Sequence, residues 1–195
     1  MIAKFEPCKL KGKISAPPSK SMAHRYLVGS ALSKENIVLT GMPGSGKSTV
    51  GKLIKIDGFE FVDTDAEIEK RCGCSIKELI STKGEKYFRD LETEVIRDVS
   101  SKGLRIISTG GGAILREENI NCLKRNGKLF FINADIKRLQ ATDDRPLSDT
   151  YEKLKKLYDE RIGIYKSTAD FVVPDMETAE AEAEYILTKR LEQIL

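Results

Sequence analysis

The sequence is short of the residues that build metal and disulfide sites. It has one histidine, His24, and four cysteines, Cys8, Cys72, Cys74 and Cys122. Cys72 and Cys74 suggest a metal or redox pair, but no second pair and no nearby histidine accompanies them. Reduced structural thiols are therefore the favoured interpretation.

Long hydrophobic runs are also missing. The longest apolar stretches are far shorter than the roughly 20 residues that cross a bilayer. The N-terminal region has Glu6 and Pro17-Pro18 where a signal peptide would have its apolar segment. We therefore expect a cytoplasmic protein without a membrane partner.

Positive charge is in excess only at the N-terminus. The net charge is +3, but residues 1–36 alone carry +5, so the rest of the chain carries −2. Because the main body is not a polycation, general nucleic-acid binding is not expected. A chain of 195 residues with 40% hydrophobic residues has room for one α/β domain with a sizeable core.

What the sequence does have is a phosphate-binding loop. A β-rich apolar run leads into GMPGSGKST at residues 41–49, which fits G-x-x-x-x-G-K-S, and a helical pattern follows. Glycine lets backbone N–H groups turn toward an anion, and a helix N-terminus adds positive charge. The predicted ligand is a nucleoside triphosphate, held by Gly44, Ser45, Gly46, Lys47, Ser48 and Thr49.

Two carboxylates follow the next predicted strand, residues 59–62. Asp63 and Asp65 should face the phosphate loop, because ligands of open α/β sheets bind beyond the carboxyl ends of the strands. Asp63 is placed to hold Mg²⁺, and Asp65 to accept a hydrogen bond from a hydroxylated substrate. Helix N-capping by Thr64 or Asp65 is the alternative, and it is compatible with these roles.

Two further candidates have plain structural alternatives. Arg89 lies among acidic neighbours in a helical region predicted over residues 66–101, so it is either a ligand contact or part of a solvated, salt-bridged helix face. Three successive glycines, residues 110–112, follow a strand predicted at 104–108. They either let backbone N–H groups approach a ligand or form a flexible turn.

A polar segment at residues 140–150 contains Arg145. Beside a triphosphate it suits a mobile lid that excludes water, and Arg145 could neutralise charge on the transferring phosphoryl group. A surface loop with an ordinary arginine is the alternative. The other predicted elements here are a strand at 128–132, a short helix at 135–139, a helix at 151–165 carrying Arg161, a strand at 171–173 and a helix at 177–195.

Taken together, these motifs resemble the shikimate kinase family over about residues 37–190. The motifs that carry the resemblance are the phosphate loop, Asp63-Thr64-Asp65, Phe88-Arg89, the triple glycine, Arg145-Pro146-Leu147, and Arg161 with Tyr165. The resemblance implies a P-loop NTPase fold like that of nucleoside-monophosphate kinases, an α/β three-layer sandwich with a central parallel five-stranded sheet. It also implies a monomeric enzyme that uses ATP and Mg²⁺ to phosphorylate the 3-hydroxyl of shikimate, a step toward chorismate and the aromatic amino acids.

The resemblance further implies a role for individual residues. Lys47, Asp65 and Arg145 would carry catalysis, with Asp65 orienting the hydroxyl and accepting its proton. Shikimate would be bound by Asp65, Arg89, Gly110, Gly111, Gly112 and Arg161, with the arginines on its carboxylate. Ser48 and Asp63 would hold magnesium, Arg138 would lie against the adenine, and Arg145 would contact the phosphates.

The first 36 residues differ from the rest. Leu10–Leu27 resembles the start of 3-phosphoshikimate 1-carboxyvinyltransferase, in which the lysine and serine of an S-K-S motif, here at residues 19–21, contact the substrates. That enzyme needs two large domains that this chain cannot contain. We therefore interpret residues 1–36 as a basic, non-functional leader and residues 37–195 as the kinase domain.

The residues alone leave three other activities open. One is another small-molecule P-loop kinase, acting on gluconate or a nucleoside monophosphate. A second is a nucleotide-binding module without turnover. The third is the carboxyvinyl transfer that the leader suggests.

Overall fold

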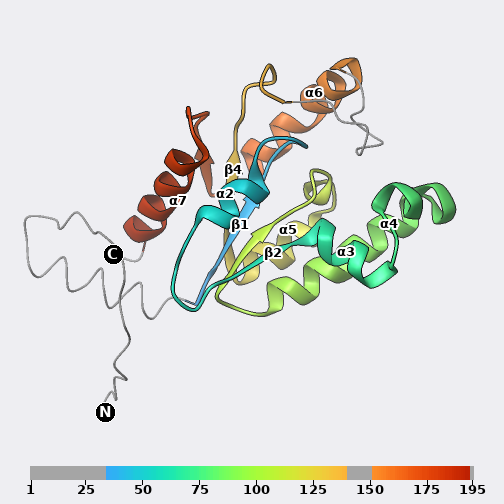
Figure 1. The fold of residues 1–195 in the computed structure, drawn as a ribbon, viewed down its shortest axis with the longest axis horizontal. Coiled ribbons are helices and arrows are strands. Elements are labelled where there is room, and N and C mark those ends of the chain that lie inside the picture. Colours follow the sequence, from blue (N-terminus) through green and yellow to red (C-terminus); the bar gives the residue numbers. More distant parts are fainter. Residues whose placement is uncertain (1–33, 140–150, 194–195) are drawn as a thin grey trace, which may run out of the picture.

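The computed structural model describes residues 34–139 and 151–193 as strands and helices that alternate around one sheet (Figure 1). The strands are β1 (Asn36–Thr40), β2 (Glu60–Asp63), β3 (Arg105–Ser108), β4 (Gly127–Ile132) and β5 (Phe171–Val173). The helices are α2 (Lys47–Leu53), α3 (Thr64–Cys72), α4 (Ile76–Ser101), the 3₁₀ helix η1 (Ala113–Leu115), α5 (Glu117–Arg125), α6 (Tyr151–Thr168) and α7 (Ala179–Gln193).

The sheet has five strands in the order β2-β3-β1-β4-β5, and every neighbouring pair is parallel. Parallel neighbours need a crossover from one edge to the other, which the helices supply. The carboxyl ends of all five strands therefore meet at one edge. This edge receives the phosphate loop after β1, Asp63 at the end of β2 and the triple glycine after β3.

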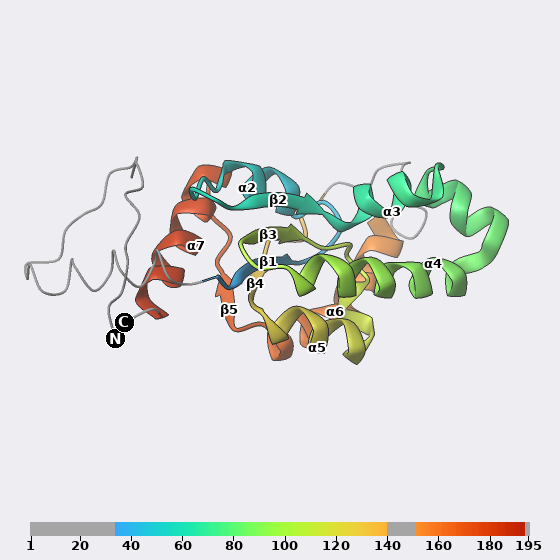
Figure 2. The ribbon, with the colours of Figure 1, turned by 90° about the horizontal axis from the view of Figure 1, so that it is seen from below.

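Helices cover both faces of the sheet (Figure 2). Successive strand residues point to opposite faces, and β1 shows the result: Ile37 and Leu39 pack in one cluster with α2 and α7, while Val38 packs in another with α4 and α5. All three side chains are fully buried. The predicted α/β sandwich of three layers around a five-stranded parallel sheet is thus confirmed.

Several element boundaries differ from the prediction. The helical region expected over residues 66–101 begins at Thr64 and is interrupted twice. Helix α3 ends before Gly73, which adopts a left-handed φ of 72°, and within α4 Gly84 has non-helical φ and ψ values of 85° and 161°. The short helix predicted at 135–139 is wrong: a turn lies there, and the Asp135 carboxylate accepts the N–H of Lys137 at 2.8 Å. Such a side-chain bond competes with helical hydrogen bonding.

Helix α5 had no counterpart among the predicted elements. It follows Arg116, an N-cap whose side chain makes no capping hydrogen bond. Serine, threonine, aspartate and asparagine are the residues that usually mark the start of a helix. Because α5 begins after an arginine, its start is hard to predict from the sequence. Its buried Leu123 packs in the cluster with α4.

The cysteines that the structure describes are free. Cys72 and Cys74 lie at the turn between α3 and α4, with their Sγ atoms 3.5 Å apart, and Cys122 lies on α5. This agrees with the interpretation of reduced thiols.

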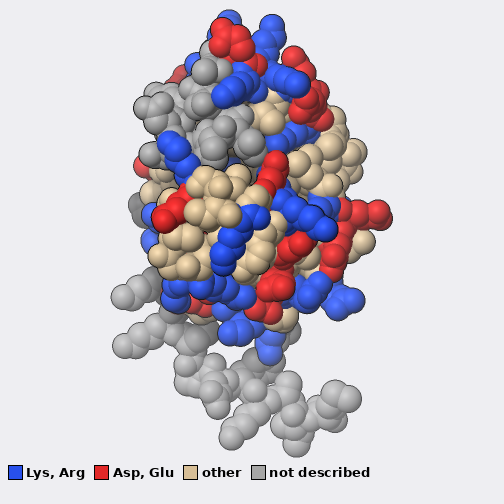
Figure 3. Space-filling view, turned by 90° about the vertical axis from the view of Figure 1, so that its right-hand side faces the viewer, with Lys and Arg blue, Asp and Glu red and all other residues tan. Residues whose placement is uncertain are grey.

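Basic and acidic side chains are interspersed on the face shown in Figure 3. None of the described helices is long and apolar enough to cross a membrane.

Candidate active site

The phosphate loop joins β1 to α2 through glycines in a conformation that other residues rarely adopt. Gly41, Gly44 and Gly46 have φ values of 152°, 85° and 83°. A Cβ on Gly41 would also lie 2.9 Å from the carbonyl oxygen of Ile132 at the end of β4. Gly46 is the N-cap of α2 and offers no side chain to accept the N–H groups of the first turn. These groups are placed to meet an anion.

Lys47 is folded back into this loop and is only 8% exposed. Its Nζ donates to the carbonyl oxygens of Gly41 and Met42 at 3.0 and 2.8 Å. The loop therefore holds a buried cation next to its backbone N–H groups. Phosphate oxygens are stronger partners for an ammonium group than neutral carbonyls are.

Three oxygen-bearing side chains meet beside the loop. Ser48 Oγ donates to Asp63 Oδ2 at 2.5 Å and lies 3.1 Å from Ser108 Oγ. The two strand residues come from the carboxyl ends of β2 and β3. Hydroxyl and carboxylate oxygens are the donors that hard divalent cations prefer.

The N-cap of α3 is Asp63, whose Oδ1 accepts the N–H groups of Asp65 and Ala66 at 3.0 and 3.3 Å. The predicted capping by Thr64 or Asp65 is therefore wrong. Thr64 is buried and its hydroxyl accepts the N–H of Gly110 at 3.0 Å. The Asp65 side chain is left to line the cavity.

Asp65 is a carboxylate in an unfavourable environment for its charge. Burial raises its pKa from 3.8 to about 6, and the negative charges of Asp63 and Glu92 add to the effect, against the opposing charges of Lys47 and Arg89. Among the described residues, none hydrogen-bonds its buried Oδ1. At neutral pH it is an ionised acceptor and a stronger base than an ordinary aspartate.

Arg89 is buried, so the alternative of a solvated helix face is wrong. It is 8% exposed on α4, and its Nη1 donates to Glu92 Oε2 at 2.8 Å while its Nη2 donates to Glu85 Oε1 at 3.3 Å. Glu92 is fully buried, and burial raises its pKa although Arg89 opposes the shift. The pair places a fixed guanidinium group in the cavity wall.

The triple glycine is a packed element rather than a flexible turn. None of its three φ values is in the left-handed region, so the backbone conformation does not require glycine here. The lack of room for a side chain does. A Cβ on any of the three would be too close to a neighbour. It would lie 2.5 Å from Asp65 Oδ1 for Gly110, 2.8 Å from Pro43 Cδ for Gly111 and 2.6 Å from Arg89 Cζ for Gly112.

Helix α6 contributes a second buried arginine. Arg161 is 6% exposed, and its Nη1 donates to the carbonyl oxygen of Gly111 at 3.1 Å. One turn later, the Tyr165 hydroxyl is 2.5 Å from the same oxygen and 2.9 Å from the carbonyl oxygen of Gly41. Burial raises the pKa of Tyr165, so its phenol stays protonated.

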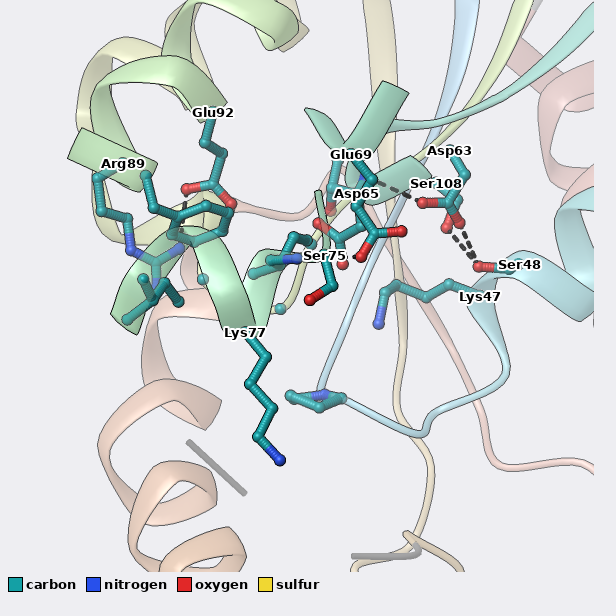
Figure 4. Close-up of a pocket in the computed structure, with 18 of the residues that line it drawn as sticks. Lys47, Ser48, Asp63, Asp65, Glu69, Ser75, Lys77, Arg89, Glu92 and Ser108 are labelled. Carbon is teal, nitrogen blue, oxygen red and sulfur yellow. Dashed lines mark hydrogen bonds and ion pairs between the residues drawn. The ribbon is translucent and has the colours of Figure 1, made fainter. Parts of the chain in front are cut away.

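One cavity of about 470 Å³ is lined by the phosphate loop, the strand ends beside it, the triple glycine and both buried arginines. In Figure 4, Lys47 and Ser48 lie at one end, Arg89 and Glu92 at the other, and Asp65 between them. The cavity is large enough for a small polar molecule. Its geometry brings a phosphate site and a guanidinium-lined pocket face to face across one carboxylate.

Comparison with known proteins gives the family. The family model described as "Shikimate kinase" matches residues 43–194. The chain belongs to the shikimate kinase family. A shikimate kinase of Caldicellulosiruptor bescii is 42% identical over 166 residues, which are 80% of this chain and 96% of that protein. One of Thermodesulfovibrio yellowstonii is 43% identical over 163 residues, 78% of this chain and 93% of that protein.

A solved structure agrees with this assignment. The shikimate kinase of Acinetobacter baumannii in complex with shikimate has a TM-score of 0.78 to this chain and is 32% identical, with 85% of this chain and 98% of that chain covered. Membership in the shikimate kinase family makes the chain an enzyme that uses ATP as a phosphoryl donor.

The structure gathers most of the predicted site residues. Those that line the cavity are Gly44, Lys47, Ser48, Asp63, Asp65, Arg89, Gly110, Gly111, Gly112 and Arg161. Ser45, Gly46 and Thr49 lie in the phosphate loop and the first turn of α2. Arg138 is apart from the cavity lining: it contacts Asp175 and donates to the carbonyl oxygen of Met176 at 2.7 Å. Arg145 lies outside the described residues.

Three residues of the site were given no role from the sequence: Glu92, Ser108 and Tyr165. The spacing of Glu92, three positions after Arg89 on a helix, is a recognisable ion-pair signal. Ser108 ends β3 at the edge where ligands bind. Tyr165 belongs, with Arg161, to the motifs that carry the family resemblance, but nothing in the sequence points to its two carbonyl partners, because both lie far away in the chain.

Proposed function

We propose that this chain transfers the γ-phosphoryl group of ATP to the 3-hydroxyl of shikimate, which gives 3-phosphoshikimate and ADP. The observation that carries the proposal is the shared cavity, which Lys47 and Ser48 of the phosphate loop line together with Asp65, Arg89 and Arg161. A nucleotide and a small acid bound there would meet across Asp65. Family membership supports the choice of acceptor.

Arg89 and Arg161 bind the acceptor's carboxylate in this proposal. A guanidinium group presents a planar fork that matches a carboxylate. Both arginines are already held in the wall by Glu92 and by the Gly111 carbonyl, so little ordering is needed when the acid arrives. Gly110 and Gly112 leave the space that this arrangement needs.

Asp65 orients the acceptor hydroxyl and takes its proton. Its pKa of about 6 leaves it ionised at neutral pH yet close enough to the working pH to be an effective base. Lys47 leaves the loop carbonyls for the phosphates and stabilises the charge that develops during transfer.

Magnesium fits the residues beside the loop. The Ser48 hydroxyl and the Asp63 carboxylate would hold it, and both are oxygen donors already in contact. No group of three acidic, histidine or cysteine side chains suited to a metal occurs in the part of the chain that the structure describes. Mg²⁺ is commonly held by one or two protein oxygens together with phosphates and water. When bound, it neutralises phosphate charge.

Other parts of the proposal come from the sequence alone. They are the contact of Arg138 with adenine, the contact of Arg145 with the phosphates, a non-functional leader at residues 1–36, a monomeric state, a cytoplasmic location and the lack of nucleic-acid and membrane partners.

The test is acceptor-dependent release of ADP by the full-length protein. With MgATP, shikimate should stimulate release strongly, whereas gluconate and a nucleoside monophosphate should not. A second protein that begins near Ser33 should behave the same if the leader has no function. Nucleotide binding without shikimate-dependent release would refute the proposal and favour a binding module.

A further inference from the structure

The Tyr165 phenol joins two loops of the site. Its ring is fully buried and stacks on Phe131, with centroids 5.0 Å apart and an interplanar angle of 2°. Its hydroxyl lies 2.9 Å from the carbonyl oxygen of Gly41 in the phosphate loop and 2.5 Å from that of Gly111 in the triple glycine. The stacked ring holds the hydroxyl between the two loops.

Each of these carbonyl oxygens also accepts a hydrogen bond from a cation of the site. Lys47 Nζ is 3.0 Å from the Gly41 oxygen, and Arg161 Nη1 is 3.1 Å from the Gly111 oxygen. An unbroken series of polar contacts therefore runs from Lys47 to Arg161 through the phenol. In the proposed function, Lys47 at one end binds the phosphates and Arg161 at the other end binds the acceptor's carboxylate.

The centre of this series has two arrangements. A protonated phenol carries one hydrogen, so it donates to one of the two carbonyl oxygens at a time. The oxygen that it prefers depends on the other donor that each carbonyl has. A change at either end of the series therefore biases the phenol, and such a two-state element can couple distant sites.

We propose that Tyr165 is a positioning residue that couples nucleotide binding to acceptor binding. When phosphates draw Lys47 away, the Gly41 oxygen becomes the better acceptor and the phenol turns toward it. The Gly111 oxygen then has Arg161 as its remaining side-chain donor and fixes that guanidinium group in the cavity wall. Nucleotide should therefore tighten acceptor binding. The inference rests on the proposed function of Lys47 and Arg161.

Direct packing between the loops is a competing route for such coupling. A Cβ on Gly111 would lie 2.8 Å from Pro43, so the two loops are close at a second point. Replacing tyrosine by phenylalanine removes the hydroxyl and keeps the ring and this packing. The substitution therefore separates the hydrogen-bonded route from the steric one.

The experiment is calorimetric titration of the full-length protein with shikimate, with and without saturating MgADP. The wild-type Kd for shikimate should fall by about fivefold or more when MgADP is bound, the low end of usual coupling. In Tyr165→Phe the change should shrink to less than about twofold, with each ligand still binding alone. Tyr158→Phe, a half-buried tyrosine on the same helix, is the matched control and should keep the wild-type factor.

A second measurement does not depend on the variant's folding. In full-length wild type labelled with 3-fluorotyrosine, the fluorine resonance of Tyr165, assigned by phenylalanine variants at the other tyrosines, should shift when MgADP is added alone. Three results would overturn this inference and leave the proposed function intact. They are a Tyr165 resonance that does not move, a wild type whose Kd for shikimate does not change with MgADP, and a change in Kd that persists in Tyr165→Phe. A wild type that binds nucleotide but no shikimate would overturn the proposed function together with it.

Discussion

Replacing Asp65 by asparagine should stabilise the protein while it removes most of the activity. The pKa of Asp65 is raised from 3.8 to about 6, chiefly by burial. Ionising it therefore costs about 3 kcal/mol more in the folded protein than in the unfolded chain, at 1.36 kcal/mol per pKa unit. Asparagine has a similar shape and carries no charge, so it avoids this cost.

The sign of the pH dependence follows from the direction of the shift. Between pH 3.8 and about 6 the folded protein binds more protons at Asp65 than the unfolded chain does, so the group's contribution to stability is lost as pH rises through this window. The free energy of unfolding of Asp65→Asn, minus that of the wild type, should therefore grow by about 2 kcal/mol from pH 4.5 to pH 7.5. Most of the growth should come below pH 6.

Urea unfolding at several pH values measures this difference directly. Asp159→Asn removes an exposed carboxylate on α6 and serves as the control, because water solvates that group in both states. The asparagine variant at position 65 should also lose at least about a hundredfold in kcat, the usual size of a general-base contribution. A stability difference that stays flat or falls with pH, or full activity in the variant, would refute the reasoning.

Two further substitutions test the acceptor end of the cavity, and a third is their control. Arg89→Ala should raise the KM for shikimate about tenfold to a hundredfold, because a charge-assisted hydrogen bond contributes about 1.5–3 kcal/mol, while the KM for ATP stays within about twofold. Gly112→Ala should raise the shikimate KM as well, since its Cβ would lie 2.6 Å from Arg89 Cζ and displace the guanidinium group. Gly163→Ala should raise the free energy of unfolding by about 0.5–1 kcal/mol with unchanged kinetics, because its Cβ meets no atom within 4 Å and alanine favours the interior of α6.

Steady-state kinetics and urea titration check all three variants. Equal losses for shikimate and ATP in Arg89→Ala would contradict its assignment to the acceptor. Gly163→Ala is the matched control for Gly112→Ala, since both add one methyl group, but the methyl group at Gly163 enters open space. If the two behaved alike, the close approach of Gly112 to Arg89 would have no functional weight.

The sequence determined the phosphate loop and the strands of the sheet around it. Residues 41–49 specify that loop locally, because glycine backbone, a preceding apolar strand and a following helix are all read from neighbouring positions. The five strands were likewise visible as short apolar runs, and the predicted ends differ from the observed ones by no more than one residue. Asp63 and Asp65 could be placed near the loop because strand ends share one edge in such sheets.

Arg89 shows where local patterns stop being sufficient. Its acidic neighbours are those of an exposed helix face, yet the structure buries it against Glu92 and under Gly112. The burial of Arg89 depends on residues that pack against it from other elements, such as the triple glycine that follows the carboxyl end of β3. The resemblance to a family pointed to Arg89; its spacing in the helix did not.

Only the tertiary structure decided how the distant parts of the site meet. The order β2-β3-β1-β4-β5 brings Ser48, Asp63 and Ser108 together, and α6 carries Tyr165 to within hydrogen-bonding distance of Gly41, which is 124 positions away in the chain. The burial of Asp65 that raises its pKa arises in the same way. Such contacts follow from how both faces of the sheet are covered, and that packing is a property of the whole chain rather than of any short run of residues.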